Sequence, residues 1–443
     1  MLRRAGVATA GAALFGGTAP YAFAGPLKYK SRSLKGDLSI VQWAHVAPRY
    51  NAWFDQTWAK TWGEQNDVQV SVDRVVYTRL PALAAAEVKN QRGHDMFGFL
   101  SPPARYEDQV IDHTAIVSQV EREVGPYGDL GKRSTYNPRT KRYFGVSDYF
   151  VPAPTIWRHD LWNSIGESPA TWDHVRAAAP TLKALGHPIG IGQSGEADSN
   201  VALIAFMMCF GSFIQDESNA LAIDSTNTVE AVQFMADLYA NGEESSIFGW
   251  NPASNNQFVL GGRGSMIVNA ISAIYRAEDL GMPFAKDLWI WPVPRGPRGR
   301  FAPGQYTSVY SIWKFAKNKD AAEKFIADLC IESKPAILAS RMFNFPSFPG
   351  SVPLKEIYKT AAADVHPPRG KYTILTTIAS KYTRNVGYPG YSNAAVEEVL
   401  DTFLIPRMFA QVSQGKMSAE ESVRSTAKVM KGIWARWRAA GKI

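Results

Sequence analysis

Cysteine and histidine are scarce in this sequence, which has two cysteines and seven histidines in 443 residues. Two cysteines cannot build a disulfide framework, and no Cys/His cluster has the spacing of a zinc site. Cys209 and Cys330 each lie in an apolar run that is typical of a helix. This favours two buried free thiols, with one disulfide between them as the alternative.

Catalytic and nucleotide-binding motifs are also missing. The sequence has no H-E-x-x-H and no G-x-S-x-G pattern, and residues 261–265 (GGRGS) lack the lysine of a phosphate-binding loop. Residues 190–195 (GIGQSG) match G-x-G-x-x-G, but no hydrophobic strand leads into them, so we interpret them as a loop. A pair of carboxylates acting on a sugar stays open, because such a pair is formed in space. We predict no cofactor and no metal.

No apolar run reaches the length of a membrane span without a charge. A shorter one stands at the N-terminus, where Arg3 and Arg4 precede small, uncharged residues up to Pro20. The segment 22–24 (AFA) then has the pattern that a signal peptidase cuts, before Gly25. Residues 1–24 are therefore predicted to be a signal peptide that directs the protein to the periplasm, through either the Sec or the Tat route. No cysteine follows the cleavage site, so we expect no lipid anchor.

Basic residues do not gather into a stripe, although the formal net charge is +8. A nucleic-acid-binding surface needs such a stripe, so we expect no nucleic acid as a partner. Aromatic residues are abundant instead, with 13 Trp, 18 Tyr and 22 Phe. Their rings fill cores, and they also form flat surfaces on which a ligand can stack.

The first part of the chain alternates between strands and helices. Residues 38–43, 68–76 and 96–100 are predicted strands, and residues 53–62 and 80–89 are predicted helices. This order implies parallel pairing in an α/β domain. Ligands of such sheets bind beyond the carboxyl ends of the strands, here after Trp43 and Phe99.

The rest of the chain contains two extended segments, around a largely helical region. Residues 143–157 are apolar, aromatic and rich in proline, and residues 292–303 are rich in proline and glycine. Both are typical of an extended connection rather than of a helix. Between them we expect helices, together with strands at 265–268 and 288–292, and from residue 394 onward a series of helices.

Several segments in order along the chain resemble the family 1 extracellular solute-binding proteins of bacterial ABC importers, which include the maltose-binding proteins. Residues 143–149 (YFGVSDY) resemble the family's crossing segment, and residues 156–173 contain the pattern that ends in P-x-T-W-x. Further similar segments are 221–242, 258–266 (FVLGGRGSM), 288–299, 312–329 and 415–422. Their order and spacing extend over nearly the whole chain after residue 25.

The resemblance implies an α/β fold of two lobes joined by hinge crossings, the type II periplasmic binding protein fold. The N-terminal lobe would comprise residues 25–147 and 296–340, and the C-terminal lobe residues 148–295 and 341–443. It also implies a binding protein that is not an enzyme, captures a small solute such as a carbohydrate or polyol, and delivers it to the membrane permease of an ABC importer. We expect it to act as a monomer. A secreted carbohydrate-active enzyme and a solute-binding accessory of a chemoreceptor are the alternatives.

The resemblance also places the residues that would contact the solute. They lie after strands, in the first crossing and in the loop near residue 305, and they are Trp43, His45, Phe99, Ser101, Asp148, Tyr149, Asn269, Ser272, Gln305 and Tyr306. Two features depart from the pattern: Val151 stands where the maltose-binding subgroup has an acidic residue, and Ser212 replaces a glycine. The sequence therefore does not single out maltodextrin as the solute.

Overall fold

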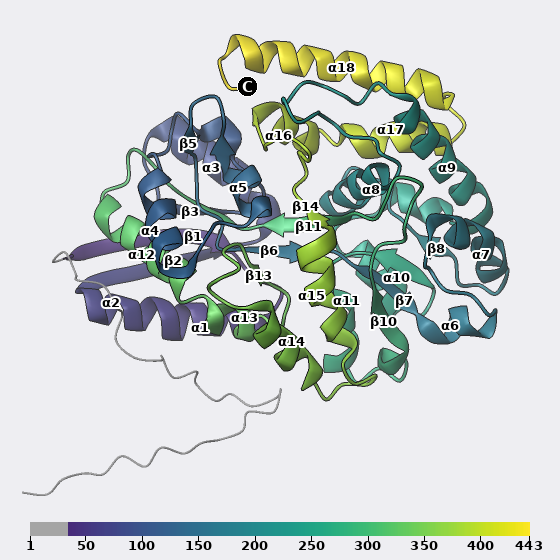
Figure 1. Cartoon of the computed structure of the whole chain (residues 1–443), viewed down its shortest axis with the longest axis horizontal. Coiled ribbons are helices and arrows are strands. Elements are labelled where there is room, and N and C mark those ends of the chain that lie inside the picture. Colours follow the sequence, from purple (N-terminus) through teal and green to yellow (C-terminus); the bar gives the residue numbers. More distant parts are fainter. Residues whose placement is uncertain (1–33) are drawn as a thin grey trace, which may run out of the picture.

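The chain forms two α/β lobes with a connecting sheet between them (Figure 1). The structure is a computed structural model that describes residues 34–443, so the predicted signal peptide lies outside the described residues. Each lobe has its own four-stranded sheet, and the connecting sheet also has four strands. The predicted α/β class and two-lobe arrangement are confirmed.

The sheet of the first lobe has the strand order β12-β3-β1-β2. β1 (Gly36–Trp43) pairs in parallel with β2 (Val68–Val75) and β3 (Met96–Phe99), as the alternation of strands and helices predicts. The last member, β12 (Val309–Ile312), runs antiparallel to β3 and comes from far along the chain. The three parallel strands end at one edge of the sheet, so Trp43 and Phe99 begin the loops where ligands of such sheets bind.

The helix predicted over 53–62 is longer, because it includes α1 (Pro48–Trp53), a π-helical segment (Phe54–Ala59) and α2 (Lys60–Asn66). Proline is tolerated in the first turn, which explains the start at Pro48. The other helices of this lobe are α3 (Leu80–Asn90), α4 (Thr114–Val124), α5 (Asp129–Thr135), α12 (Lys319–Ile331) and α13 (Lys334–Ala339).

The sheet of the second lobe has the order β10-β7-β9-β8. Its strands are β7 (Thr155–Arg158), β8 (Ile189–Gly190), β9 (Met266–Val268) and β10 (Leu288–Trp291). Its helices are α6 (His159–Ser164), α7 (Trp172–Ala184), α8 (Ala197–Cys209), α9 (Thr226–Gly242), α10 (Ser254–Leu260) and α11 (Ser272–Asp279). Thr171 and Ser225 cap α7 and α9 by accepting hydrogen bonds from backbone N–H groups of the first turn.

The connecting sheet has the order β13-β6-β11-β14. Its strands are β6 (Tyr149–Pro152), β11 (Ala302–Thr307), β13 (Phe345–Pro346) and β14 (Thr383–Arg384). β6 lies in the first predicted crossing. The second crossing is β11, which begins where the predicted segment 292–303 ends. The residues before β11 remain on the second lobe. Gly296 and Gly299 are hydrogen-bonded to each other in a turn, and this turn packs against Cys209.

The C-terminal part of the chain adds helices to the second lobe. They are α14 (Leu354–Ala362), α15 (Ile374–Thr377), α16 (Ala394–Asp401), α17 (Leu404–Ser413) and α18 (Ala419–Ala439). α17 contacts α8 and α9, and α18 packs over α9, α16 and α17. None of the described helices combines the length and the apolar character needed to cross a membrane.

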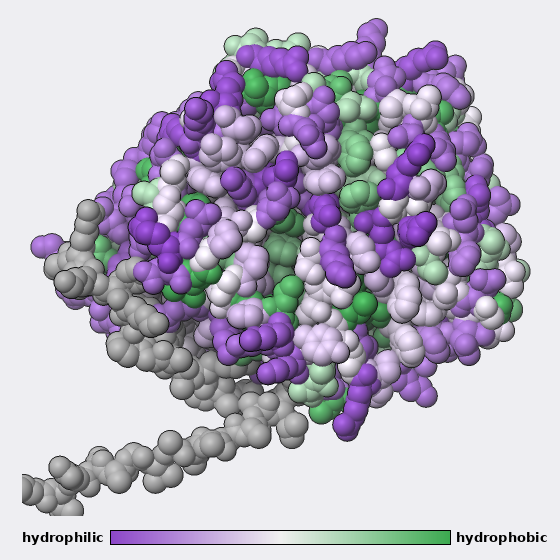
Figure 2. All heavy atoms as spheres, in the orientation of Figure 1, coloured by the Kyte–Doolittle hydropathy of each residue, from purple (hydrophilic) through white to green (hydrophobic). Residues whose placement is uncertain are grey.

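The face shown in Figure 2 is mostly hydrophilic, but hydrophobic side chains are visible near its centre, where α5 and α15 flank the connecting sheet in Figure 1. Cys209 and Cys330 are both buried and form no disulfide within residues 34–443. Burial raises the pKa of the Cys209 thiol to about 11, so this thiol is protonated at neutral pH. The structure therefore supports two free thiols.

Candidate functional site

Three of the predicted residues meet where the first lobe joins the connecting sheet. Trp43, at the end of β1, is 3% exposed and donates a hydrogen bond from Nε1 to the hydroxyl of Tyr149, with a distance of 3.0 Å. Its ring centroid lies 5.4 Å from that of Tyr306 on β11. A strand end of the lobe and two crossing strands thus combine their aromatic side chains in one cluster, which we call the aromatic cluster.

His45 extends the aromatic cluster. Its ring stacks on Tyr50 at a centroid distance of 4.4 Å and lies 4.8 Å from Trp43. The backbone N–H of Ala47 donates to Nδ1 at 2.9 Å, so Nε2 carries the proton and donates to Oδ1 of Asn344 at 3.0 Å. Burial lowers the pKa of His45 to about 3, which keeps the ring neutral at physiological pH.

The second lobe contributes a buried carboxylate, Asp198, from the first turn of α8. Its Oδ2 accepts from Asn255 at 2.8 Å, and its Oδ1 accepts from the amide of Gln305. The hydroxyl of Tyr306 lies 3.5 Å from the same Oδ1. Burial, and then the charge of Glu196, raise the pKa of Asp198 to about 7. Gln305 and Tyr306 therefore connect the aromatic cluster to the second lobe.

Asn269 and Ser272 lie on the same lobe and share one partner, Asn256 of α10. The amide of Asn269 donates to Oδ1 of Asn256 at 3.0 Å, and the amide of Asn256 donates to Oγ of Ser272 at 2.9 Å. Asn256 is next to Asn255, which holds Asp198. These side chains form a polar row on the second lobe that ends at Asp198.

Three predicted residues lie apart from this arrangement. The ring of Phe99 packs on Phe97, Tyr106 and Trp313 in the core of the first lobe, and Ser101 is exposed. Asp148 is buried, and burial raises the pKa of its carboxyl to about 7.

Some polar atoms around the aromatic cluster have no hydrogen-bond partner among the described residues. They include Oε1 of Gln305, Nδ2 of Asn344 and the hydroxyl of Tyr50. Buried polar groups without partners are uncommon in folded proteins, because each costs desolvation energy. Gln305 lies on β11, and Asn344 and Tyr50 contact His45, so these unpartnered atoms lie next to the aromatic cluster.

The family of the chain follows from comparison with known proteins. Residues 51–327 match the model of the family described as bacterial extracellular solute-binding protein. The chain belongs to this family. Its members bind solutes and are not enzymes, and the family is an exported one. No curated protein sequence matches the chain.

Solved structures of solute-binding proteins share the fold of this chain. Maltose-bound MalE3 of T. maritima is 20% identical with a TM-score of 0.72, and the match covers 90% of this chain and 100% of that one. A sugar transporter from Arthrobacter chlorophenolicus A6 with bound laminaribiose is 15% identical, with a TM-score of 0.72 and coverage of 90% and 99%. An ABC transporter solute-binding protein from Agrobacterium radiobacter K84 in complex with ribitol is 13% identical, with a TM-score of 0.68 and coverage of 91% and 100%.

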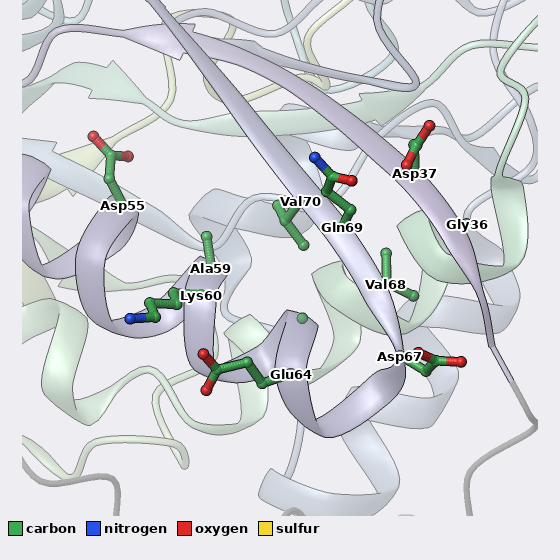
Figure 3. A pocket seen from close by; sticks show the side chains of 11 residues that line it. Gly36, Asp37, Asp55, Ala59, Lys60, Glu64, Asp67, Val68, Gln69 and Val70 are labelled. Atoms are coloured by element: carbon green, nitrogen blue, oxygen red, sulfur yellow. The ribbon is translucent and has the colours of Figure 1, made fainter.

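A hollow seen in close-up lies elsewhere on this solute-binding protein (Figure 3). Its volume is about 580 Å³, and it is lined by Gly36, Val68 and side chains of α2 such as Lys60 and Glu64. Gly36 begins β1 and Trp43 ends it, so the hollow and the aromatic cluster are at opposite ends of an eight-residue strand, roughly 25 Å apart. The hollow is therefore not the predicted solute site.

Sequence reasoning missed Tyr77, Asp198 and Asn344. Tyr77 follows β2, and its ring lies 6.0 Å from that of Tyr306, so the strand-end rule that selected Trp43 would also have found it. Asp198 lies in the first turn of α8, outside the segments on which the resemblance was based. Asn344 has no local signal, because only the return of the chain through β13 brings it to His45.

Proposed function

We propose that this protein is the solute-binding component of an ABC importer, and that it captures a small carbohydrate or polyol between its lobes and delivers it to the inner-membrane permease. The aromatic cluster supports this proposal most directly. Aromatic faces stack on the apolar face of a sugar ring, and amide and carboxyl groups bind its hydroxyls. Neighbouring structures named above contain maltose, laminaribiose and ribitol, which are of this chemical class.

Within this proposal, the solute contacts Trp43, His45, Tyr149 and Tyr306 on one side. On the other side it contacts polar residues of the second lobe and of the crossing strand, which are Asp198, Asn269, Ser272 and Gln305. Oε1 of Gln305 accepts a hydrogen bond from a solute hydroxyl, and Nδ2 of Asn344 donates one to a solute hydroxyl. Phe99, Ser101 and Asp148 stay predicted contacts. The packing of Phe99 in the core of the first lobe supports a structural role for this residue.

A thermal-shift screen tests the proposal. We expect at least one of maltose, laminaribiose, ribitol and related sugars to raise the melting temperature, because a ligand at one hundred times its Kd stabilises the native state by about 2.7 kcal/mol. Affinity is expected in the micromolar range or tighter, about −8 kcal/mol. The bound sugar should be recovered chemically unchanged by mass spectrometry. Turnover of the sugar by the pure protein would contradict a transport function.

Solute binding is also expected to draw the lobes together. β6, β11 and β13 connect the lobes, and bending of such strands allows hinge closure around a ligand. X-ray scattering should therefore give a smaller radius of gyration for the saturated protein than for the free protein. A radius that stays constant while binding is confirmed calorimetrically would indicate a rigid site.

We further propose that the mature protein begins at Gly25 and acts as a periplasmic monomer that does not bind nucleic acid. The signal-peptide pattern in residues 1–24 supports the processing site. Mass spectrometry of the protein from its native host should find Gly25 as the first residue. An intact N-terminus starting at Met1 would contradict both the cleavage and the periplasmic location.

A further inference from the structure

The C-terminal segment beyond the family match forms ion pairs with the first lobe. The family model ends at residue 327, whereas α16 comprises Ala394–Asp401. Oε1 of Glu397 on α16 forms an ion pair with the guanidinium of Arg105, 2.8 Å from its Nε, and Oε2 accepts a hydrogen bond from the backbone N–H of Arg105, also at 2.8 Å. Asp401, one turn later, lies 2.5 Å from the same guanidinium.

Arg105 belongs to the first lobe. It lies in the short 3-10 helix Ala104–Tyr106, in the loop that follows β3. Its neighbour Tyr106 packs on Phe99 and Trp313 in the core of that lobe. Any movement of the first lobe as a body therefore moves the guanidinium of Arg105.

α16 is fixed to the second lobe. It packs against α17 and α18, which in turn contact α8 and α9. The amide of Asn200 on α8 donates to the carbonyl of Leu400 at 3.0 Å. The ring of Phe403, just after α16, lies beside Gly195, in the loop that leads to Asp198. The carboxylates of α16 therefore move with the lobe that contributes Asp198 to the proposed solute site.

A second contact of the same kind lies beside the first. Nζ of Lys442, near the C-terminus, is 2.5 Å from Oδ1 of Asp108 and donates to the carbonyl of Arg105 at 3.0 Å. Asp108 follows Arg105 in the first lobe, whereas Lys442 follows α18 on the second. Two ion-pair contacts therefore join the lobes at one place, apart from the strands of the connecting sheet.

We propose that Arg105, with Glu397 and Asp401, is an ion-pair latch that holds the two lobes closed over the solute. This inference rests on the proposed function in one respect, which is that closure of the lobes encloses a solute. In the described conformation, Tyr306 of β11 already connects the two lobes at the site, since its hydroxyl lies 3.5 Å from Oδ1 of Asp198 on α8 and its ring centroid lies 5.4 Å from that of Trp43. Opening the lobes separates Arg105 from α16, so the latch favours the closed state. Arg105 acts here as a positioning residue and does not contact the solute.

The test measures the distance between the lobes in the absence of any solute. Spin labels are attached to cysteines introduced at Ala86 of α3 and Ala184 of α7, which are exposed and belong to different lobes. The native thiols are buried, which disfavours their labelling. Pulsed electron resonance then gives the populations of short and long distances in 20 mM and 500 mM salt.

We expect Arg105→Ala to raise the long-distance population at low salt by about fivefold or more, since breaking a partly buried ion pair leaves its carboxylates unpaired. High salt should raise that population in the wild type, because salt screens exposed charges, and should have little further effect in Arg105→Ala. If Arg105→Ala folds poorly, Asp401→Asn is used, because Asp401 is the more exposed partner. Arg263→Ala is the matched control, since it breaks an ion pair with Glu244 inside the second lobe.

Distance distributions of Arg105→Ala and Asp401→Asn that match the wild type at both salt concentrations would overturn the latch. The same distributions shifted equally by Arg263→Ala would also overturn it, because the effect would then not depend on contacts between lobes. No sugar is present in these measurements. If no sugar raises the melting temperature but Arg105→Ala still shifts the distance distribution, the proposed solute class is contradicted and the latch is supported.

Discussion

Trp43→Ala is expected to weaken the binding of the sugar identified by thermal shift at least tenfold. Stacking on an aromatic face contributes on the order of 1 kcal/mol beyond burial, and the indole also positions Tyr149 through a hydrogen bond of 3.0 Å. The melting temperature of the variant should also fall, because Trp43 is buried. Affinity is measured by titration calorimetry on the folded protein, and tryptophan fluorescence should change when the sugar binds to the wild type.

Two further variants separate binding from stability. Trp43→Phe keeps an aromatic ring but loses the N–H group that donates to Tyr149, so it should retain more affinity than Trp43→Ala. Trp172→Phe alters a buried tryptophan that packs on Phe206 in the second lobe, and it should lower the melting temperature without changing affinity. A Trp43→Ala protein that is destabilised but binds the sugar with wild-type affinity would make Trp43 a core residue only.

Asp148→Asn is expected to make the free energy of unfolding less dependent on pH. Burial raises the pKa of Asp148 from its ordinary value of 3.8 to about 7. Between about pH 4 and pH 7 the folded chain keeps this proton and the unfolded chain has lost it, so the free energy of unfolding falls as pH rises through this window. The difference in unfolding free energy between Asp148→Asn and the wild type should therefore grow by up to about 4 kcal/mol from pH 4 to pH 7.

Urea denaturation at several pH values measures this difference, with Asp173→Asn, which removes an exposed carboxylate on α7, as the control. Glu243 is another buried carboxyl, and burial raises its pKa to about 8. The free energy of unfolding of Asp148→Asn should therefore still fall somewhat as pH rises. Parallel curves for the variant and the wild type would refute the effect of Asp148. The same variant also tests the predicted contact, because an unchanged sugar affinity would remove Asp148 from the solute site.

The sequence predicted the first lobe well because its signals are local. β1, β2 and β3 begin and end within two residues of the predicted strands, since each is an apolar run bounded by turn residues. Parallel pairing followed from the helices between them. The second crossing was placed too early because proline and glycine mark both a turn and an extended segment, and here residues 296–299 form the turn.

The site could be predicted only in part, because it depends on which face of a strand meets the other lobe. Trp43 and Phe99 both end parallel strands, yet only Trp43 contacts the crossing strands, whereas Phe99 packs on Trp313. This difference depends on β12, which pairs with β3 and comes from the second half of the chain. Asn344 and Asp198 likewise reach the site only through the complete fold.

The pairing of β12 with β3 also determines when the protein can fold during its synthesis. Val309 pairs with Phe99, more than 200 residues earlier in the chain. A ribosome adds roughly 5–20 residues per second, so β3 waits on the order of 10–40 s for its antiparallel neighbour. During that time the buried residues 96–99 form an unpaired, apolar edge that can associate with other chains. The edge of β3 therefore stays unpaired in a nascent chain until residue 312 has emerged, and a fragment that ends before residue 309 is expected to be insoluble.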